Sequence, residues 1–215
     1  MDAAPSPGRC GRCPGHDLGQ LCARFNGPVA AFPDDGPRNP PCVRLLAVLP
    51  EESGERLFVE VVDEIAGRLA GRNPLVITVM NGGLVFAGQL LPRLPFALDV
   101  SYVHVRRYGR ETRGGELVWI AGPQEPVSGR TVLLLDDILD EGETLLAIRS
   151  RFYELGASEV LLAAFAVKVR KELPRVMADF MGLRVPDRFV FGFGMDVGGR
   201  WRNLPSIRAL KETAD

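Results

Sequence analysis

The chain has 215 residues, of which 46% are hydrophobic and 25% charged, and its formal net charge is −1. This composition is that of a globular protein with one well-filled core, and the near-neutral charge argues against bulk nucleic-acid binding. No apolar run is long enough to span a membrane, and the N-terminus lacks the apolar core of a signal peptide, so we expect a cytoplasmic protein.

Residues 1–42 are rich in proline, glycine, cysteine and alanine, and they show little apolar periodicity. Such a composition is typical of coil, so we predict a disordered or extended N-terminal arm and one folded domain over residues 43–215. Cys10 and Cys13 form a Cys-x-x-Cys pair with His16 nearby, but no second tight pair of zinc ligands follows. Reduced thiols are therefore favoured over a zinc site.

The first predicted helix and strand follow in the next forty or so residues. The helix is marked by apolar residues at helical spacing, which are Phe58, Val61, Val62, Ile65 and Leu69. Gly71 ends it. Residues 74–79 form a short β-branched run that is typical of a buried strand, and the sequence MNGG at residues 80–83 breaks it. Residues 84–94 predict a short helix that ends around Pro92.

Residues 96–105 predict a second strand, and the polar, glycine-containing residues 106–120 predict an exposed, mobile hairpin or loop. A further buried strand is predicted over residues 131–135, followed by an acidic turn and a helix. One face of this helix carries Leu145, Ile148, Phe152 and Leu155. Gly156 ends the helix.

Residues 160–167 predict the strand that follows this helix, and residues 188–196 predict a last strand. Strand, turn, helix and strand within so short a segment form a βαβ unit. The fold class is therefore α/β, and we expect a mostly parallel central sheet with both faces covered by helices.

The acidic turn has the sequence VLLLDDILDEGET at residues 132–144. In an open α/β sheet, ligands bind beyond the carboxyl ends of the strands, and Asp136 and Asp137 fall at that edge. Gly142 permits a tight turn, and Thr144 stands where a helix begins and its free backbone N–H groups attract an anion. The turn therefore offers hydrogen-bond donors to a phosphate, and carboxylates to sugar hydroxyls or a metal. This combination indicates a ribose 5-phosphate site.

Other phosphate motifs fit this segment poorly. No Gly-Lys-Ser/Thr follows a glycine run as in the Walker loop, and no Gly-x-Gly-x-x-Gly fingerprint follows a strand. The letters DDILD match the aspartate-rich motif of isoprenoid synthases, but that motif lies within a long helix, and here it follows a β-type run. A capped turn with solvated acids is the simplest alternative, and the full pattern after a buried strand disfavours it.

The segment resembles the phosphoribosyl-diphosphate (PRPP) signature of type I phosphoribosyltransferases. Residues 43–210 resemble hypoxanthine-guanine phosphoribosyltransferases in particular, through MNGG, VLLLDDILDEGET, AVKVRK and FVFGFGMDVGGRWRNL in that order. The resemblance implies the type I phosphoribosyltransferase fold, with a small hood and a mobile hairpin loop. It also implies Mg²⁺ as cofactor, PRPP and a 6-oxopurine as substrates, and a homodimer or homotetramer without nucleic-acid or membrane partners.

The resemblance implies a role for each residue of the acidic turn. Asp136 and Asp137 are similar to the pair that binds the ribose hydroxyls, directly or through magnesium. Asp140 is similar to the catalytic acid near N7 of a purine, where it could take or stabilise a proton. The implied ribose-phosphate site comprises Asp136, Asp137, Ile138, Asp140, Glu141, Gly142, Glu143 and Thr144.

Residues outside the turn are also assigned by the resemblance. Lys168 is similar to the lysine that donates to the 6-oxo group, Phe189 to the aromatic residue that stacks on the base, and Val190 to the residue whose backbone faces the 2-position. Asp196, grouped with them at the base, is similar to the acid that orders a second magnesium ion. Taken singly, Lys168 could be an ordinary solvated lysine and Phe189 a core residue.

The remaining assignments concern the leaving group and the closure of the site. Arg202 resembles the arginine that contacts pyrophosphate, although with Asp196 it could instead form a surface ion pair. The backbone at Asn81 and Gly82 resembles the other pyrophosphate loop, in which a non-proline cis peptide is common. Arg107 and Tyr108 resemble part of the mobile loop that closes over the reacting centre.

The chain departs from familiar members at four positions. Many have threonine where Glu141 stands and a non-acidic residue where Glu143 stands, and two acids would repel a phosphate unless their side chains point outward. Many also have lysine at the position of Asn81 and serine at that of Arg107. These differences bear on affinity and subunit contacts more than on reaction type.

Two other functions remain open on the same fold. One is a non-enzymatic regulator that senses PRPP or nucleotides, although Asp140, Lys168 and Arg202 are all present and no helix-turn-helix precedes the domain. The other is a phosphoribosyltransferase for another base, such as xanthine or uracil.

Overall fold

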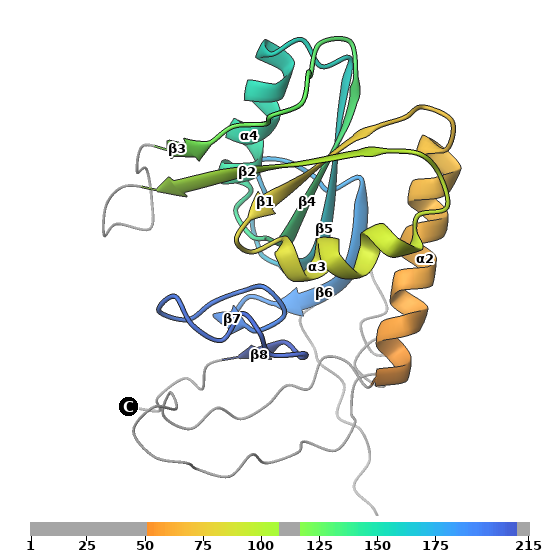
Figure 1. The fold of residues 1–215 in the computed structure, drawn as a ribbon. Helices are drawn as coiled ribbons and strands as arrows, with labels where there is room; N and C mark the ends of the chain where they lie inside the picture. Colours follow the sequence, from red (N-terminus) through yellow and green to blue (C-terminus); the bar gives the residue numbers. More distant parts are fainter. Residues whose placement is uncertain (1–50, 108–116, 210–215) are drawn as a thin grey trace, which may run out of the picture.

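The computed structural model describes residues 51–107 and 117–209 (Figure 1). The predicted N-terminal arm, the boundary near residue 43, the Cys-x-x-Cys pair and Tyr108 lie outside these residues. Most of the predicted mobile loop lies outside them as well. No helix within the described ranges has the length and apolar character needed to cross a membrane.

A six-stranded sheet forms the centre of the described residues, in the order β3-β2-β1-β4-β5-β6. The strands are β1 (Leu75–Met80), β2 (Asp99–Arg107), β3 (Leu117–Ala121), β4 (Thr131–Leu139), β5 (Glu159–Val169) and β6 (Phe180–Pro186). Neighbouring strands pair in parallel, except that β2 and β3 form an antiparallel hairpin. The prediction of a mostly parallel α/β sheet is therefore confirmed.

Helices cover both faces of this sheet (Figure 1). They are α2 (Glu51–Leu69), α3 (Leu84–Leu90), the short 3₁₀ helix η1 (Leu91–Arg93) and α4 (Glu143–Glu154). In β4, Leu133 and Leu135 belong to the core beneath α2 and α3, whereas Val132 and Leu134 belong to the core beneath α4. Alternate residues of a strand point to opposite faces, so a continuous apolar run is buried on both sides.

Strand β4 continues further than its apolar run predicted. Asp136 pairs with Ala164 of β5, and the pairing continues to Leu139. Asp136 and Asp137 therefore lie inside the last part of β4 and not after its end. The strand can include them because backbone hydrogen bonding is independent of side-chain polarity once β5 supplies the partners.

Two predictions near the C-terminus were wrong in detail. Strand β6 was missed because Gly182 interrupts the alternation of its buried residues, Phe180, Leu183 and Val185, and Pro186 ends it. The predicted strand over residues 188–196 is reduced to β7 (Val190–Phe191), which pairs with β8 (Arg208–Ala209) in a separate two-stranded sheet. Positive φ angles at the three residues from Gly192 to Gly194 turn the chain away.

Candidate active site

The acidic turn forms a pocket of about 410 Å³ at the carboxyl edge of the sheet. The pocket is lined by Asp136, Asp137, Ile138, Leu139, Asp140, Glu141, Gly142, Glu143, Thr144 and Leu145. Strand β4 delivers the first of these residues and the start of α4 holds the last. The predicted ribose-phosphate segment therefore surrounds one cavity, at the edge where parallel sheets bind ligands.

Asp136 and Asp137 place two carboxyl groups side by side at the carboxyl edge of the sheet, and Asp137 is only 7% exposed. The backbone N–H of Asp137 donates to Asp136 Oδ1 at 3.0 Å, and that of Ile138 donates to Asp137 Oδ1 at 2.7 Å. Burial raises the pKa of both carboxyls, that of Asp137 to about 6, and the charge of Asp137 raises the pKa of Asp136 further. A bound cation would offset the repulsion.

The loop after β1 packs against this pair with no spare room. A Cβ atom added at Gly82 would lie 2.3 Å from Asp137 Oδ2, and one added at Gly194 would lie 2.1 Å from the carbonyl oxygen of Gly82. The peptide bond between Met80 and Asn81 is cis, as the resemblance implied. The loop after β1, the end of β4 and the segment after β7 thus pack closely at Gly82 and Gly194. A larger residue at either glycine would displace the neighbouring atoms.

Arg202 connects the C-terminal segment to the acidic pair. Its guanidinium forms an ion pair with Asp196, donates to the carbonyl oxygen of Gly194 at 2.6 Å, and lies 4.0 Å from Asp137 Oδ2. Asp196 also accepts a hydrogen bond of 2.7 Å from the backbone N–H of Gly199. Since Arg202 lies between Asp196 and Asp137, which lines the pocket, its ion pair with Asp196 is more than an isolated surface contact.

The turn into α4 has the shape that an anion site needs. Gly142 caps the helix with a φ of +79°, and α4 begins at Glu143. The turn rests on the β5–β6 connection, because the N–H of Arg175 donates to the carbonyl oxygen of Glu141 at 2.8 Å and Val176 lies against Gly142. The first turn of α4 therefore starts from a turn of the chain that the β5–β6 connection supports.

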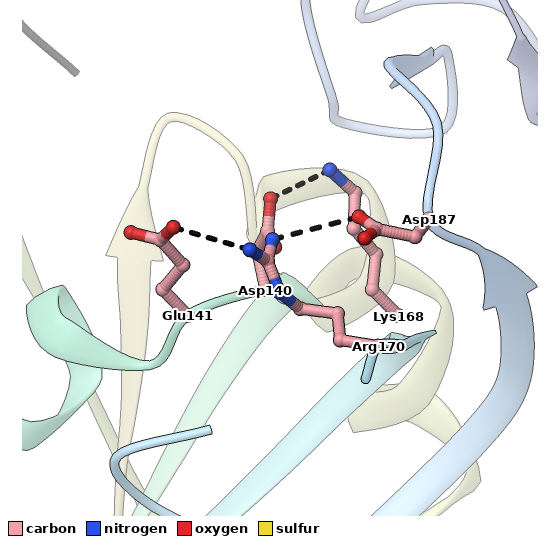
Figure 2. A network of polar contacts seen from close by, with 5 residues as sticks. All are labelled: Asp140, Glu141, Lys168, Arg170 and Asp187. Carbon is pink, nitrogen blue, oxygen red and sulfur yellow. Dashed lines mark hydrogen bonds and ion pairs between the residues drawn. The ribbon is translucent and has the colours of Figure 1, made fainter. Parts of the chain in front are cut away.

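Asp140 is the centre of a charged network at the pocket rim (Figure 2). Its Oδ2 accepts from Lys168 Nζ at 2.6 Å, and its Oδ1 accepts a hydrogen bond from Arg170 Nη1. Arg170 also contacts Glu141 and Asp187. The hydrogen bond to Asp140 raises the pKa of Arg170. Lys168, 12% exposed, is not the ordinary solvated lysine of the simpler interpretation.

Sequence reasoning missed Arg170 and Asp187. Arg170 follows Lys168 by two residues in AVKVRK, and because alternate strand residues share a face, this spacing was a usable signal. Asp187 carried no such signal, because it directly follows β6, a strand that was itself missed. Glu141, the acid expected to repel a phosphate, is met by Arg170 Nη2 at 3.2 Å.

Two of the predicted base-binding residues, Phe189 and Val190, lie at the start of the small sheet. Phe189 is 53% exposed, so its ring is available to a ligand and is not part of the core, whereas Val190 is buried in β7. Arg107 is the last residue of β2, at the start of the predicted mobile loop.

Within residues 51–107 and 117–209, no three metal-binding side chains converge on one point. The donors that are present still suit Mg²⁺, which usually takes one or two carboxylates together with substrate phosphates and water. Asp136 and Asp137 form such an adjacent pair at the pocket. Among the described residues, Asp196 does not join this pair to form a site of three metal ligands.

A mostly parallel sheet with an acidic pair at its carboxyl edge, followed by a glycine turn into a helix, defines an α/β protein of the type I phosphoribosyltransferase fold. The sequence pattern of the phosphoribosyl transferase domain matches residues 51–197. The chain belongs to this family, and it is a phosphoribosyltransferase.

Individual relatives agree with the family pattern. The chain is 32% identical over 154 residues to a hypoxanthine-guanine phosphoribosyltransferase of Streptococcus thermophilus, covering 71% of this chain and 86% of that protein. It is 32% identical over 165 residues to the Bacillus subtilis protein of the same name, covering 76% and 92%. A hypoxanthine phosphoribosyltransferase structure from Staphylococcus aureus, 24% identical, superimposes with a TM-score of 0.71 over 77% of this chain and 90% of that one, which supports the fold.

Proposed function

We propose that this chain transfers the 5-phosphoribosyl group of PRPP to hypoxanthine, guanine or both, in purine salvage, with Mg²⁺ as cofactor. The observation that carries the choice of base is the contact between Lys168 Nζ and Asp140 Oδ2 at 2.6 Å. These atoms place a donor and an acceptor side by side at the pocket rim. A 6-oxopurine offers the matching acceptor at O6 and, when N7 carries hydrogen, a donor beside it on the same edge.

The same pair disfavours other bases. Adenine carries an amino group at position 6, so a lysine there would face a donor. Relatives that act on pyrimidines tend to lack an aspartate at the position of Asp140. A hypoxanthine-guanine specificity is further supported by the two bacterial relatives, which are both named hypoxanthine-guanine phosphoribosyltransferase.

The mechanism follows from the placement of charge around the pocket. As the bond at ribose C1′ breaks, positive charge develops on the sugar and negative charge on the departing pyrophosphate, which Arg202 would contact. Asp140 would accept or stabilise the proton at N7 of the incoming base. Asp136 and Asp137 would hold the ribose hydroxyls, and the turn at Gly142 would hold the 5′-phosphate. Bound Mg²⁺ would supply charge neutralisation on the pyrophosphate.

A panel of bases tests this proposal directly. The protein is mixed with PRPP and Mg²⁺ and with hypoxanthine, guanine, xanthine, adenine or uracil in turn, and the nucleotide formed is identified by chromatography. We expect inosine or guanosine monophosphate, or both. Product from xanthine or uracil alone would assign a different base, and no product from any base would favour a regulator that senses PRPP or nucleotides.

We expect Lys168→Ala to weaken the binding of inosine monophosphate by about 10- to 100-fold, because one charge-assisted hydrogen bond to the 6-oxo group is lost. Isothermal titration calorimetry measures this, and ribose 5-phosphate, which lacks the base, should keep its affinity. Lys171→Ala is the matched control, because Lys171 is an exposed lysine of the same segment. Unchanged affinity for the nucleotide would contradict the assigned contact.

A further inference from the structure

Arg170 binds three carboxylates that come from two sides of the candidate site (Figure 2). Its Nη1 donates to Asp140 Oδ1 and lies 3.5 Å from Asp187 Oδ1, while its Nη2 donates to Glu141 Oε1 at 3.2 Å. The Arg170 side chain is 20% exposed. Asp140 and Glu141 belong to the phosphate turn, and Asp187 precedes the predicted base-stacking residue Phe189 by two positions.

The two oxygens of Asp140 are thereby made different. Arg170 occupies Oδ1, and Lys168 lies at Oδ2. A carboxylate that is held at one oxygen by a guanidinium cannot rotate freely about its terminal bond, whereas without that partner the torsion is broad. Arg170 therefore keeps Oδ2 beside the lysine donor, and this oxygen, which accepts from Lys168 Nζ at 2.6 Å, has a second lone pair for a substrate donor.

Arg170 also compensates for a second acid of the phosphate turn. Glu141 lines the pocket that is expected to bind a phosphate. The Arg170 guanidinium bound to the Glu141 carboxylate reduces the repulsion between that carboxylate and an incoming anion. The same contact holds the carboxylate on the β5 side of the turn. The same arginine thus serves both the acceptor for the base and the electrostatics of the phosphate turn.

We propose that Arg170 is a positioning residue, which fixes Asp140 so that Oδ2 and Lys168 Nζ together receive the O6–N7 edge of a 6-oxopurine. This inference rests on the proposed function. A misplacement of about 1 Å in such a pair costs about 100-fold in rate, so the arginine should matter greatly to base use although it touches no reacting atom.

Steady-state kinetics at saturating PRPP test the proposal. We expect Arg170→Gln to lower kcat/KM for hypoxanthine or guanine by about 100-fold. Arg170→Lys should recover about tenfold of this loss, because a lysine can restore one charge-assisted hydrogen bond to Asp140 but cannot bridge all three acids. With PRPP saturating, the effect of Glu141 on PRPP affinity does not enter the comparison.

Arg184→Gln is the matched control, since Arg184 is an exposed arginine of the adjacent strand β6 and should behave as wild type. Thermal unfolding accompanies each variant. The proposal is overturned if Arg170→Gln keeps wild-type kcat/KM, or if Arg170→Lys is no better than Arg170→Gln while both remain folded. A wild-type protein without transferase activity would instead refute the proposed function, so the two failures are distinguishable.

Discussion

Replacing Asp140 by asparagine should lower kcat by about 10²- to 10⁴-fold, the usual contribution of general acid–base catalysis. Asparagine keeps the size of the side chain but removes the negative charge and the basic oxygen that would accept a proton from N7. The binding of PRPP should be nearly unchanged, because the other residues assigned to the ribose-phosphate site and the backbone N–H groups of the turn remain in place. Steady-state turnover and calorimetric PRPP titration measure the two quantities separately.

Asp99→Asn provides the control for this substitution. Asp99 also pairs with an arginine, Arg130, at 2.7 Å, but it lies at the opposite edge of the sheet, where β2 begins, and is 49% exposed. Loss of such an exposed ion pair has little effect. Wild-type turnover in Asp140→Asn would refute the catalytic role. A large loss of PRPP affinity would show that Asp140 belongs to the phosphate site and not to the base site.

Replacing Gly194 by alanine should abolish most activity and destabilise the fold. The new Cβ would lie 2.1 Å from the carbonyl oxygen of Gly82, and the residue has a φ of +99°. Overpacking against backbone and a disfavoured left-handed conformation together cost about 3 kcal/mol in the free energy of unfolding. Because Gly82 contacts the Asp137 carboxylate, its displacement should reduce kcat/KM by about 100-fold or more.

Gly129→Ala separates steric overlap from backbone strain. Gly129 also has a positive φ, +75°, but no atom lies within 4 Å of its added Cβ, and it precedes β4 at the edge away from the pocket. Its substitution should cost about 1 kcal/mol by denaturant unfolding and leave kcat/KM unchanged. Equal effects of the two substitutions would contradict the close approach of Gly194 to Gly82.

The acidic turn could be located from the sequence because its signals are local. An apolar run that ends in Asp136 and Asp137, a glycine that permits positive φ, and apolar residues at helical spacing all lie within about two dozen consecutive residues. The same reasoning predicted the parallel sheet, since a strand, helix and strand in short succession allow few arrangements. It failed at β6, where Gly182 and Pro186 interrupt the alternation that predicts a strand.

The contacts among distant residues were decided by the tertiary structure. Arg170 reaches Asp140 across thirty positions because β4 and β5 pair in a register that brings their carboxyl ends together. Gly82 and Gly194 meet at Asp137 because β1 lies beside β4 and the chain turns back after β7. The sequence alone determined which residue types stand at each strand end, through local periodicity and backbone preference. Only strand register and packing decided which of them touch, since those depend on the whole sheet at once.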